Sequence, residues 1–136
     1  NDPTTGVLAL DQLHRLLKTV GKRQLRGETI LDDHRHMRVI YRTPNWEDFV
    51  HLACHEIRMC GASNVQIARR MRAMLDNLVA SLPPHRHAAL DEERRLLTES
   101  IESHYRLPED LALARIPDSQ GLGGSSGSRP SVEASR

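Results

Sequence analysis

Aromatic residues are scarce in this 136-residue sequence, which contains one Trp, one Phe and two Tyr. A hydrophobic core must therefore be filled mainly by Leu, Ile, Val, Met and Ala, with Trp46 and Phe49 as large anchors. The sequence also lacks a long apolar run. The longest extends from Gly6 to Leu10, far short of the roughly 20 residues that a membrane-spanning helix needs. These features predict a soluble chain with a small aliphatic core.

Neither sign of charge dominates the sequence. Nineteen Lys and Arg residues are balanced by eighteen Asp and Glu residues, so the net charge is +1 with neutral histidines. This balance excludes a general electrostatic attraction to nucleic acid or to an anionic membrane, although local patches remain open. The sequence also lacks a glycine-rich phosphate loop, a Walker motif and a nucleophile elbow. A Ser or Cys triad that assembles only in space stays open, but nothing in the sequence singles out a catalytic residue or a cofactor site.

Cysteine is represented only by Cys54 and Cys60. Both fall in one predicted helix, where six residues correspond to a rise of about 9 Å. That separation is too large for a disulfide in an intact helix. We predict two reduced thiols, which fits a cytoplasmic setting.

Apolar residues recur at helical spacing in four segments. The first runs from Pro3 to Gly21, with Asp2 as its N-cap, and places Asp11 on the solvated face together with Arg15 and Lys18. The second runs from Asn45, paired with Asp48 in a capping box, to Gly61.

The third helix is expected to open at Ser63 with Gln66, by the same capping signature, and to stop before Pro83 and Pro84. The fourth runs from His85 or His87 to about His104, and residues 109–114 add one or two turns. The positions expected to be buried are Leu13, Leu17, Val20, Val39, Phe49, Ala53, Ile57, Ile67, Met71, Leu75, Leu78 and Leu97.

The pattern changes between the first two helices. Residues 28–32 and 37–42 read as two short strands joined by a turn, and the second alternates apolar and charged positions. Because a lone hairpin is only marginally stable in water, we expect it to pack on the helices. Leu52 and Met59, which lie off the main apolar stripe of the second helix, are its expected contacts.

These elements predict an α+β fold that is predominantly α: about four amphipathic helices with one β-hairpin between the first and second. The helical domain is expected to span residues 1–116. Residues 117–136 are rich in Ser, Gly and Pro and carry few apolar side chains. Such a segment cannot offset its ordering entropy by burial, so we predict a disordered tail.

Three residues of the second helix have metal-binding side chains. His51, Cys54 and His55 have the spacing i, i+3, i+4, which brings their side chains within reach of one another. Both histidines lie opposite the apolar stripe, a third ligand is needed, and Arg58 on the same side would repel a cation. A solvated face is therefore the preferred interpretation, and a metal site is the alternative.

A basic cluster lies on the third helix at Arg69, Arg70 and Arg72. The preceding segment has a passing likeness to helix-turn-helix DNA readers, with Gly61 at the turn. Against nucleic-acid binding, the apolar stripe runs the full length of the helix, Arg72 can pair with Asp76, and the net charge is near neutral. We do not expect nucleic acid as a partner and keep this as a second alternative.

Two blocks of the sequence carry a resemblance to a known family. The first is Asn1-Asp2-Pro3-Thr4-Thr5 followed by Ala9-Leu10-Asp11-Gln12-Leu13. The second comprises Arg38-Val39-Ile40, Pro44, Trp46-Glu47-Asp48-Phe49, Ala53, Ile57-Arg58 and Gly61. The blocks resemble a family of predicted bacterial membrane proteins known only as a domain of unknown function. The sequence departs from the family at Cys60, where an aromatic residue usually precedes the glycine.

The resemblance covers about residues 1–115 and implies a longer protein, in which N-terminal transmembrane helices precede a soluble domain such as this one. A start at Asn1 without a Met fits that expectation. We therefore expect a non-enzymatic, cytoplasmic domain that is tied to the membrane through the missing segment. It would act by packing on that segment, by forming a homo-oligomer, or by sensing a ligand.

Overall fold

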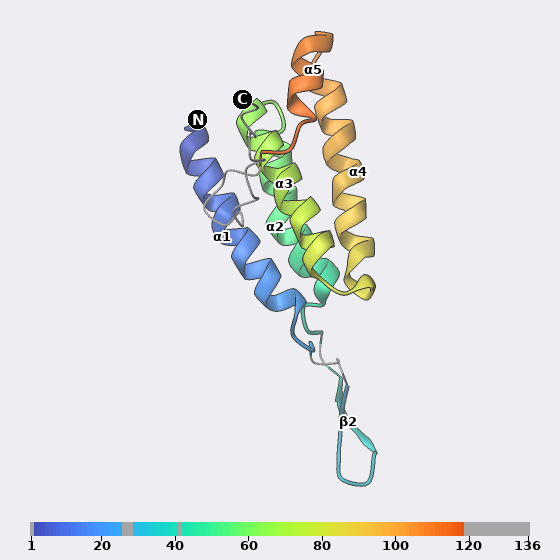
Figure 1. Ribbon diagram of the computed structural model, residues 1–136. Helices are drawn as coiled ribbons and strands as arrows, with labels where there is room; N and C mark the ends of the chain where they lie inside the picture. Colours follow the sequence, from blue (N-terminus) through green and yellow to red (C-terminus); the bar gives the residue numbers. More distant parts are fainter. Residues whose placement is uncertain (1, 26–28, 41, 119–136) are drawn as a thin grey trace, which may run out of the picture.

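The computed structural model describes residues 2–25, 29–40 and 42–118. The elements in chain order are α1 (Pro3–Gly21), β1 (Thr29–Leu31), β2 (Met37–Ile40), α2 (Trp46–Gly61), α3 (Val65–Ser81), the 3₁₀ helix η1 (Pro84–Arg86), α4 (His87–His104) and α5 (Pro108–Ala114). The four long helices lie side by side as a bundle, and α5 lies at the end where α4 finishes (Figure 1). The predicted fold class is confirmed.

The first three long helices, α1, α2 and α3, begin where short polar side chains replace missing backbone partners. Asp2 accepts a hydrogen bond from the backbone N–H of Thr4, and Asn45 forms a reciprocal capping box with Asp48, as predicted. The predicted cap of α3 is wrong. Asn64, not Ser63, accepts from the N–H groups of Gln66 and Ile67, because the helix begins one residue later and Asn is an equally good cap.

The core lies between the four long helices. Its largest fully buried side chains come from all of them: Leu10, Trp46, Val50, Cys54, Met71, Met74, Leu75, Leu78, Leu90, Leu97 and Ile101. Trp46 fills the end of the bundle near η1 and donates its indole N–H to the carbonyl oxygen of Arg86 at 2.8 Å. Gly21 permits this packing, since a Cβ there would lie 2.6 Å from Leu82 Cδ1.

Half of the predicted core positions are confirmed as buried. Leu17, Ala53, Met71, Leu75, Leu78 and Leu97 are buried. A second group is half-buried and packs against the core from outside: Leu13, Val20, Phe49, Ile57 and Ile67. The aliphatic stripes therefore predict the inward faces correctly, with graded burial at their edges.

The hairpin departs from the prediction. Its strands pair antiparallel, with Ile30 opposite Val39, but it extends beyond the end of the bundle instead of packing on it (Figure 1). Val39 is 48% exposed, so its predicted burial is wrong. Leu52 and Met59, its expected contacts, are 76% and 62% exposed. Alternation along a strand fixes which residues share a face but not what covers that face.

Asp32 organises the turn of the hairpin. Its carboxylate accepts hydrogen bonds from the backbone N–H groups of His34 and His36, and pairs with Arg38 at 2.7 Å. Arg35 takes a left-handed φ of 61° at the turn. These local contacts shape the turn without any help from the helices.

The predicted tail falls almost entirely outside the described residues. Only residues 117 and 118 are described, and the backbone N–H of Asp118 donates to the carbonyl oxygen of Arg69 at 3.1 Å. Across the described ranges, no helix is long and apolar enough to span a bilayer.

Candidate functional site

Five polar or charged side chains lie inside the bundle: Asp11, His14, Arg58, Arg70 and Glu93. The sequence placed Asp11 on a solvated face and left charged groups and histidines in water, and for these residues that expectation is wrong. Each is at most 8% exposed. Buried charges require partners, and here the partners form two separate clusters.

The first cluster joins α1 to α3. Arg70 donates its Nε–H to the Asp11 carboxylate at 2.6 Å, and both side chains are 3% exposed. His14 Nε2 lies 2.9 Å from the amide oxygen of Asn77. Burial lowers the pKa of His14, the hydrogen bond that its Nε2–H donates to Asn77 Oδ1 raises it, and the neighbouring Arg70 guanidinium lowers it, so that the net shift is downward. The lowered pKa favours the neutral form of the imidazole between the two helices.

The second cluster joins α2 to α4. Arg58 donates its Nε–H to Glu93 Oε2 at 3.3 Å, and its Nη2 lies 3.4 Å from His55 Nδ1. On the other side of the carboxylate, His51 Nδ1 is 3.8 Å from Glu93 Oε1. The Glu93 side chain is only 5% exposed. A buried carboxylate therefore sits between a guanidinium and a histidine.

The structure separates the three predicted metal ligands. His51 and His55 are neighbours, with ring centroids 4.8 Å apart. Cys54 instead lies fully in the core, where burial raises the pKa of its thiol to about 12, so it resists becoming the thiolate that binds metal. Among the described residues, no group of three or more His, Cys, Asp or Glu side chains is placed to hold a metal ion.

The three arginines of the basic cluster point to different partners. Arg69 donates its Nε–H to the backbone oxygen of Ile116, Arg70 is buried against Asp11, and Arg72 bonds the hydroxyl of Thr98 at 2.7 Å. Asp76, the partner predicted for Arg72, is held at 2.9 Å by Arg94. Through these contacts the three arginines connect α3 to α1, to α4 and to the segment after α5. The three side chains therefore point to different parts of the fold.

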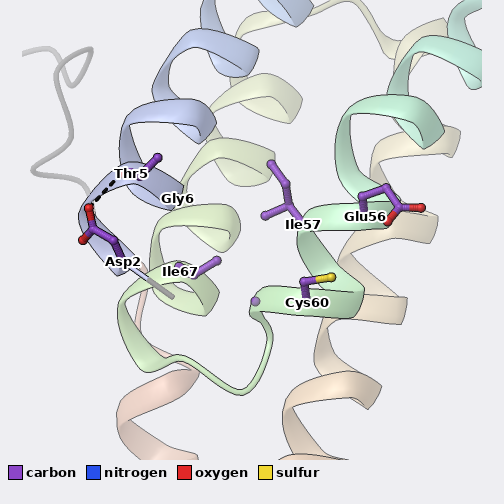
Figure 2. Close-up of a pocket in the computed structure, with 8 residues that line it drawn as sticks. Asp2, Thr5, Gly6, Glu56, Ile57, Cys60 and Ile67 are labelled. Carbon is purple, nitrogen blue, oxygen red and sulfur yellow. Dashed lines mark hydrogen bonds between the residues drawn. The ribbon is translucent and has the colours of Figure 1, made fainter.

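An apolar cleft lies between the first turns of α1 and the corner joining α2 to α3 (Figure 2). Its volume is about 490 Å³, and Gly6, Ile57, Gly61 and Ile67 form much of its lining. The glycines allow Ile67 to approach, because a Cβ on Gly61 would lie 2.6 Å from Ile67 Cγ2. The exposed Cys60 lies at its edge. The sequence analysis did not predict this cleft. Gly6 could have indicated it, because a glycine within a helical pattern often has a packing reason.

Sequence comparison assigns the chain to a family. A family model described as predicted membrane protein (DUF2254) matches residues 1–77, more than half of the chain. The chain belongs to the DUF2254 family. The resemblance seen in the sequence is thus confirmed over α1, the hairpin, α2 and most of α3, rather than as far as residue 115. No curated protein and no solved structure matches the chain.

Membership of DUF2254 establishes a predicted membrane protein family of unknown function. The matched region contains the hairpin, the apolar cleft and the Asp11–Arg70 pair. Glu93 and the rest of α4 lie beyond it. The second buried cluster therefore combines Arg58 from inside the matched region with a carboxylate from outside it.

Proposed function

We propose that this domain is non-enzymatic and holds copies of its membrane protein together through the hairpin. The observation that carries the proposal is the exposure of every large apolar side chain described in the two strands. Ile30, Leu31, Met37, Val39 and Ile40 are between 45% and 63% exposed. A concentration of exposed apolar side chains on an extended arm is characteristic of a contact surface.

The exposed side chains occupy both faces of the hairpin. Ile30 and Val39 are opposite one another in the register and share one face. Ile40 follows Val39 directly and therefore lies on the other face. Within the described residues, β1 and β2 pair only with each other, so each strand also has a free edge. A suitable partner must cover two apolar faces and supply hydrogen bonds to the free edges.

A second copy of the chain meets both requirements. Lipid could cover the faces, but it offers no hydrogen bonds to strand edges, and open edges do not occur in the hydrocarbon region. Hairpins from several copies can extend one another's sheets and pack face to face. Charges of both signs around the turn, on Asp32, Asp33, Arg35 and Arg38, suit contact between identical arms.

The position of the hairpin is compatible with a shared membrane. The hairpin and the first turn of α1 lie at opposite ends of the bundle (Figure 1). A rotation axis parallel to the helices would bring the hairpins together and keep the α1 N-termini on one side. That arrangement suits copies in which a proposed membrane segment before α1 enters one bilayer.

The test is the molar mass of the chain in solution, by light scattering over a range of concentrations. Wild-type protein should self-associate, and Ile30→Asp should shift it to the monomer with an unchanged helical circular dichroism spectrum. Leu52→Asp is the matched control, because Leu52 is equally apolar and 76% exposed, but lies on α2. A monomeric wild type, or dissociation by Leu52→Asp and not by Ile30→Asp, would overturn the proposal.

A further inference from the structure

A second cleft lies at the end of the bundle from which the hairpin extends, between the segment that follows α1 and η1 (Figure 1). Its volume is about 480 Å³, within the range of small-molecule sites. The charged side chains of its lining are Lys22, Arg23 and Arg86, with the His85 imidazole beside them. No described acidic side chain lines this cleft. Although the net charge of the chain is only +1, positive charge is therefore concentrated here.

Arg86 is the fixed part of the lining. Its Nε–H donates to the carbonyl oxygen of Gly21 at 3.3 Å, and its Nη2 donates to the carbonyl oxygen of Arg23 at 3.0 Å. Its Cζ lies over the Trp46 ring, 5.4 Å from the centroid. These contacts hold the guanidinium in place and leave Nη1 without a protein acceptor within the described residues. A guanidinium held in this way can bind an anion with little further loss of side-chain freedom.

The end of α1 does not cancel this positive charge. The last carbonyl groups of a helix carry partial negative charge and by themselves oppose an anion. Here the carbonyl oxygens of Gly21 and Arg23 already accept hydrogen bonds from Arg86. The exposed side chains of Lys22, Arg23 and His85 form no ion pair in the described part of the chain. An anion that enters the cleft therefore meets cations without first having to break a salt bridge.

A phosphate group suits this lining better than a carboxylate. A phosphate ester carries more negative charge and has three terminal acceptor oxygens that point in different directions. Arginine and lysine donors that come from two separate segments can therefore each reach an oxygen. Leu25 and Pro83 supply apolar surface for carbon atoms attached to the phosphate. We propose that the cleft between α1 and η1 binds a phosphate group, whose oxygens accept hydrogen bonds from Arg86 Nη1, Lys22 and Arg23.

The experiment is a titration of the ¹⁵N-labelled chain with inorganic phosphate at fixed pH, followed by NMR of the backbone amides. Saturable shifts are expected at Lys22, Arg23, His85 and Arg86, at millimolar concentrations of so small a ligand. Sodium chloride added to the same ionic strength is the control, and it should not saturate these shifts. No saturable response to phosphate, or an equal response to chloride, overturns the proposal.

Two variants test the site itself. Lys22→Gln and Arg23→Gln each remove one cation from the lining and should weaken phosphate binding by about three- to tenfold. Both side chains are exposed, and the Arg23 carbonyl that binds Arg86 is retained, so the helical circular dichroism spectrum should be unchanged. Arg106→Gln is the matched control, since it removes the same charge from an exposed position between α4 and α5 and should change affinity by less than about twofold. Unchanged binding in both cleft variants, or an equal loss in Arg106→Gln, would contradict the site.

Two further arms distinguish the sources of the phosphate group. Ethyl phosphate is a soluble monoester, whereas phosphatidylcholine vesicles that contain phosphatidylglycerol present phosphate at a lipid surface. Saturable binding of ethyl phosphate without cosedimentation of the chain with vesicles would identify a soluble ligand. Cosedimentation that is lost in Lys22→Gln and Arg23→Gln would identify a lipid headgroup. Self-association through the hairpin is measured separately by molar mass, so failure of one proposal leaves the other intact.

Discussion

Asp11 and Arg70 are the most deeply buried charged pair in the described part of the bundle, and they lie on different helices. Removing Arg70 takes the ion pair away from a carboxylate that stays buried, which is far more costly than losing a surface ion pair. Arg70→Met should therefore lower the free energy of unfolding by about 3–5 kcal/mol. Urea denaturation followed by circular dichroism measures the change.

The matched control is Arg95→Met, which breaks an exposed pair with Glu92 and should cost less than about 1 kcal/mol. The double variant Asp11→Leu with Arg70→Met removes both charges and should recover much of the lost stability. If Arg70→Met cost no more than Arg95→Met, the pair would not contribute to holding α1 on α3.

His14 gives the bundle a pH dependence of known sign. Its pKa is lowered from 6.5 in the folded protein, chiefly by burial, so the unfolded chain binds more protons than the folded chain below pH 6.5. Stability from this residue is complete above pH 6.5 and falls as the pH drops toward the lowered pKa. We expect the thermal midpoint to decrease between pH 7.5 and 5, and His14→Gln to decrease less. If the thermal midpoint of wild type and of His14→Gln fell equally with pH, His14 would not be a source of the pH dependence.

At the scale of elements, α3 shows how a capping signature can be displaced by one residue. Ser63 and Asn64 are adjacent and both are good N-caps, but only Asn64 accepts hydrogen bonds from the first turn. Asn64→Ala should therefore lower the free energy of unfolding by about 1 kcal/mol, and Ser63→Ala by less than about 0.5 kcal/mol. Chemical denaturation of the two variants compares them directly. A larger loss of stability in Ser63→Ala than in Asn64→Ala would instead identify Ser63 as the cap.

The α2 helix shows why the candidate metal ligands could not be assessed from spacing alone. A helical wheel placed His51 and His55 away from the stripe, and the structure keeps both near the outer surface of α2. Cys54, three residues after His51, instead turns fully into the core against α4. The depth at which a flank residue is buried depends on how closely the next helix approaches, and that distance is a tertiary property.

At the scale of the molecule, the bundle and the hairpin are separable. The core draws on all four long helices, and the side chains of β2 are exposed throughout. Replacing residues 26–42 with a short Gly/Ser linker should leave the helical circular dichroism spectrum in place and change the free energy of unfolding of the monomer by less than about 1 kcal/mol. Loss of the folded bundle in this variant would show that the hairpin contributes to its core.

The sequence by itself determined the helices, their inward faces, the hairpin and the family. Periodic aliphatic side chains, caps and helix breakers act over a few residues, so their effects can be read from local spacing. Only the tertiary structure decided that Asp11, Arg70, Arg58 and Glu93 are buried as pairs, because each partner lies at least 35 residues away. Only the tertiary structure also decided that the hairpin extends away from the bundle. The same apolar pattern in its strands would suit contact with a helix or with another copy, so the pattern alone cannot distinguish the two.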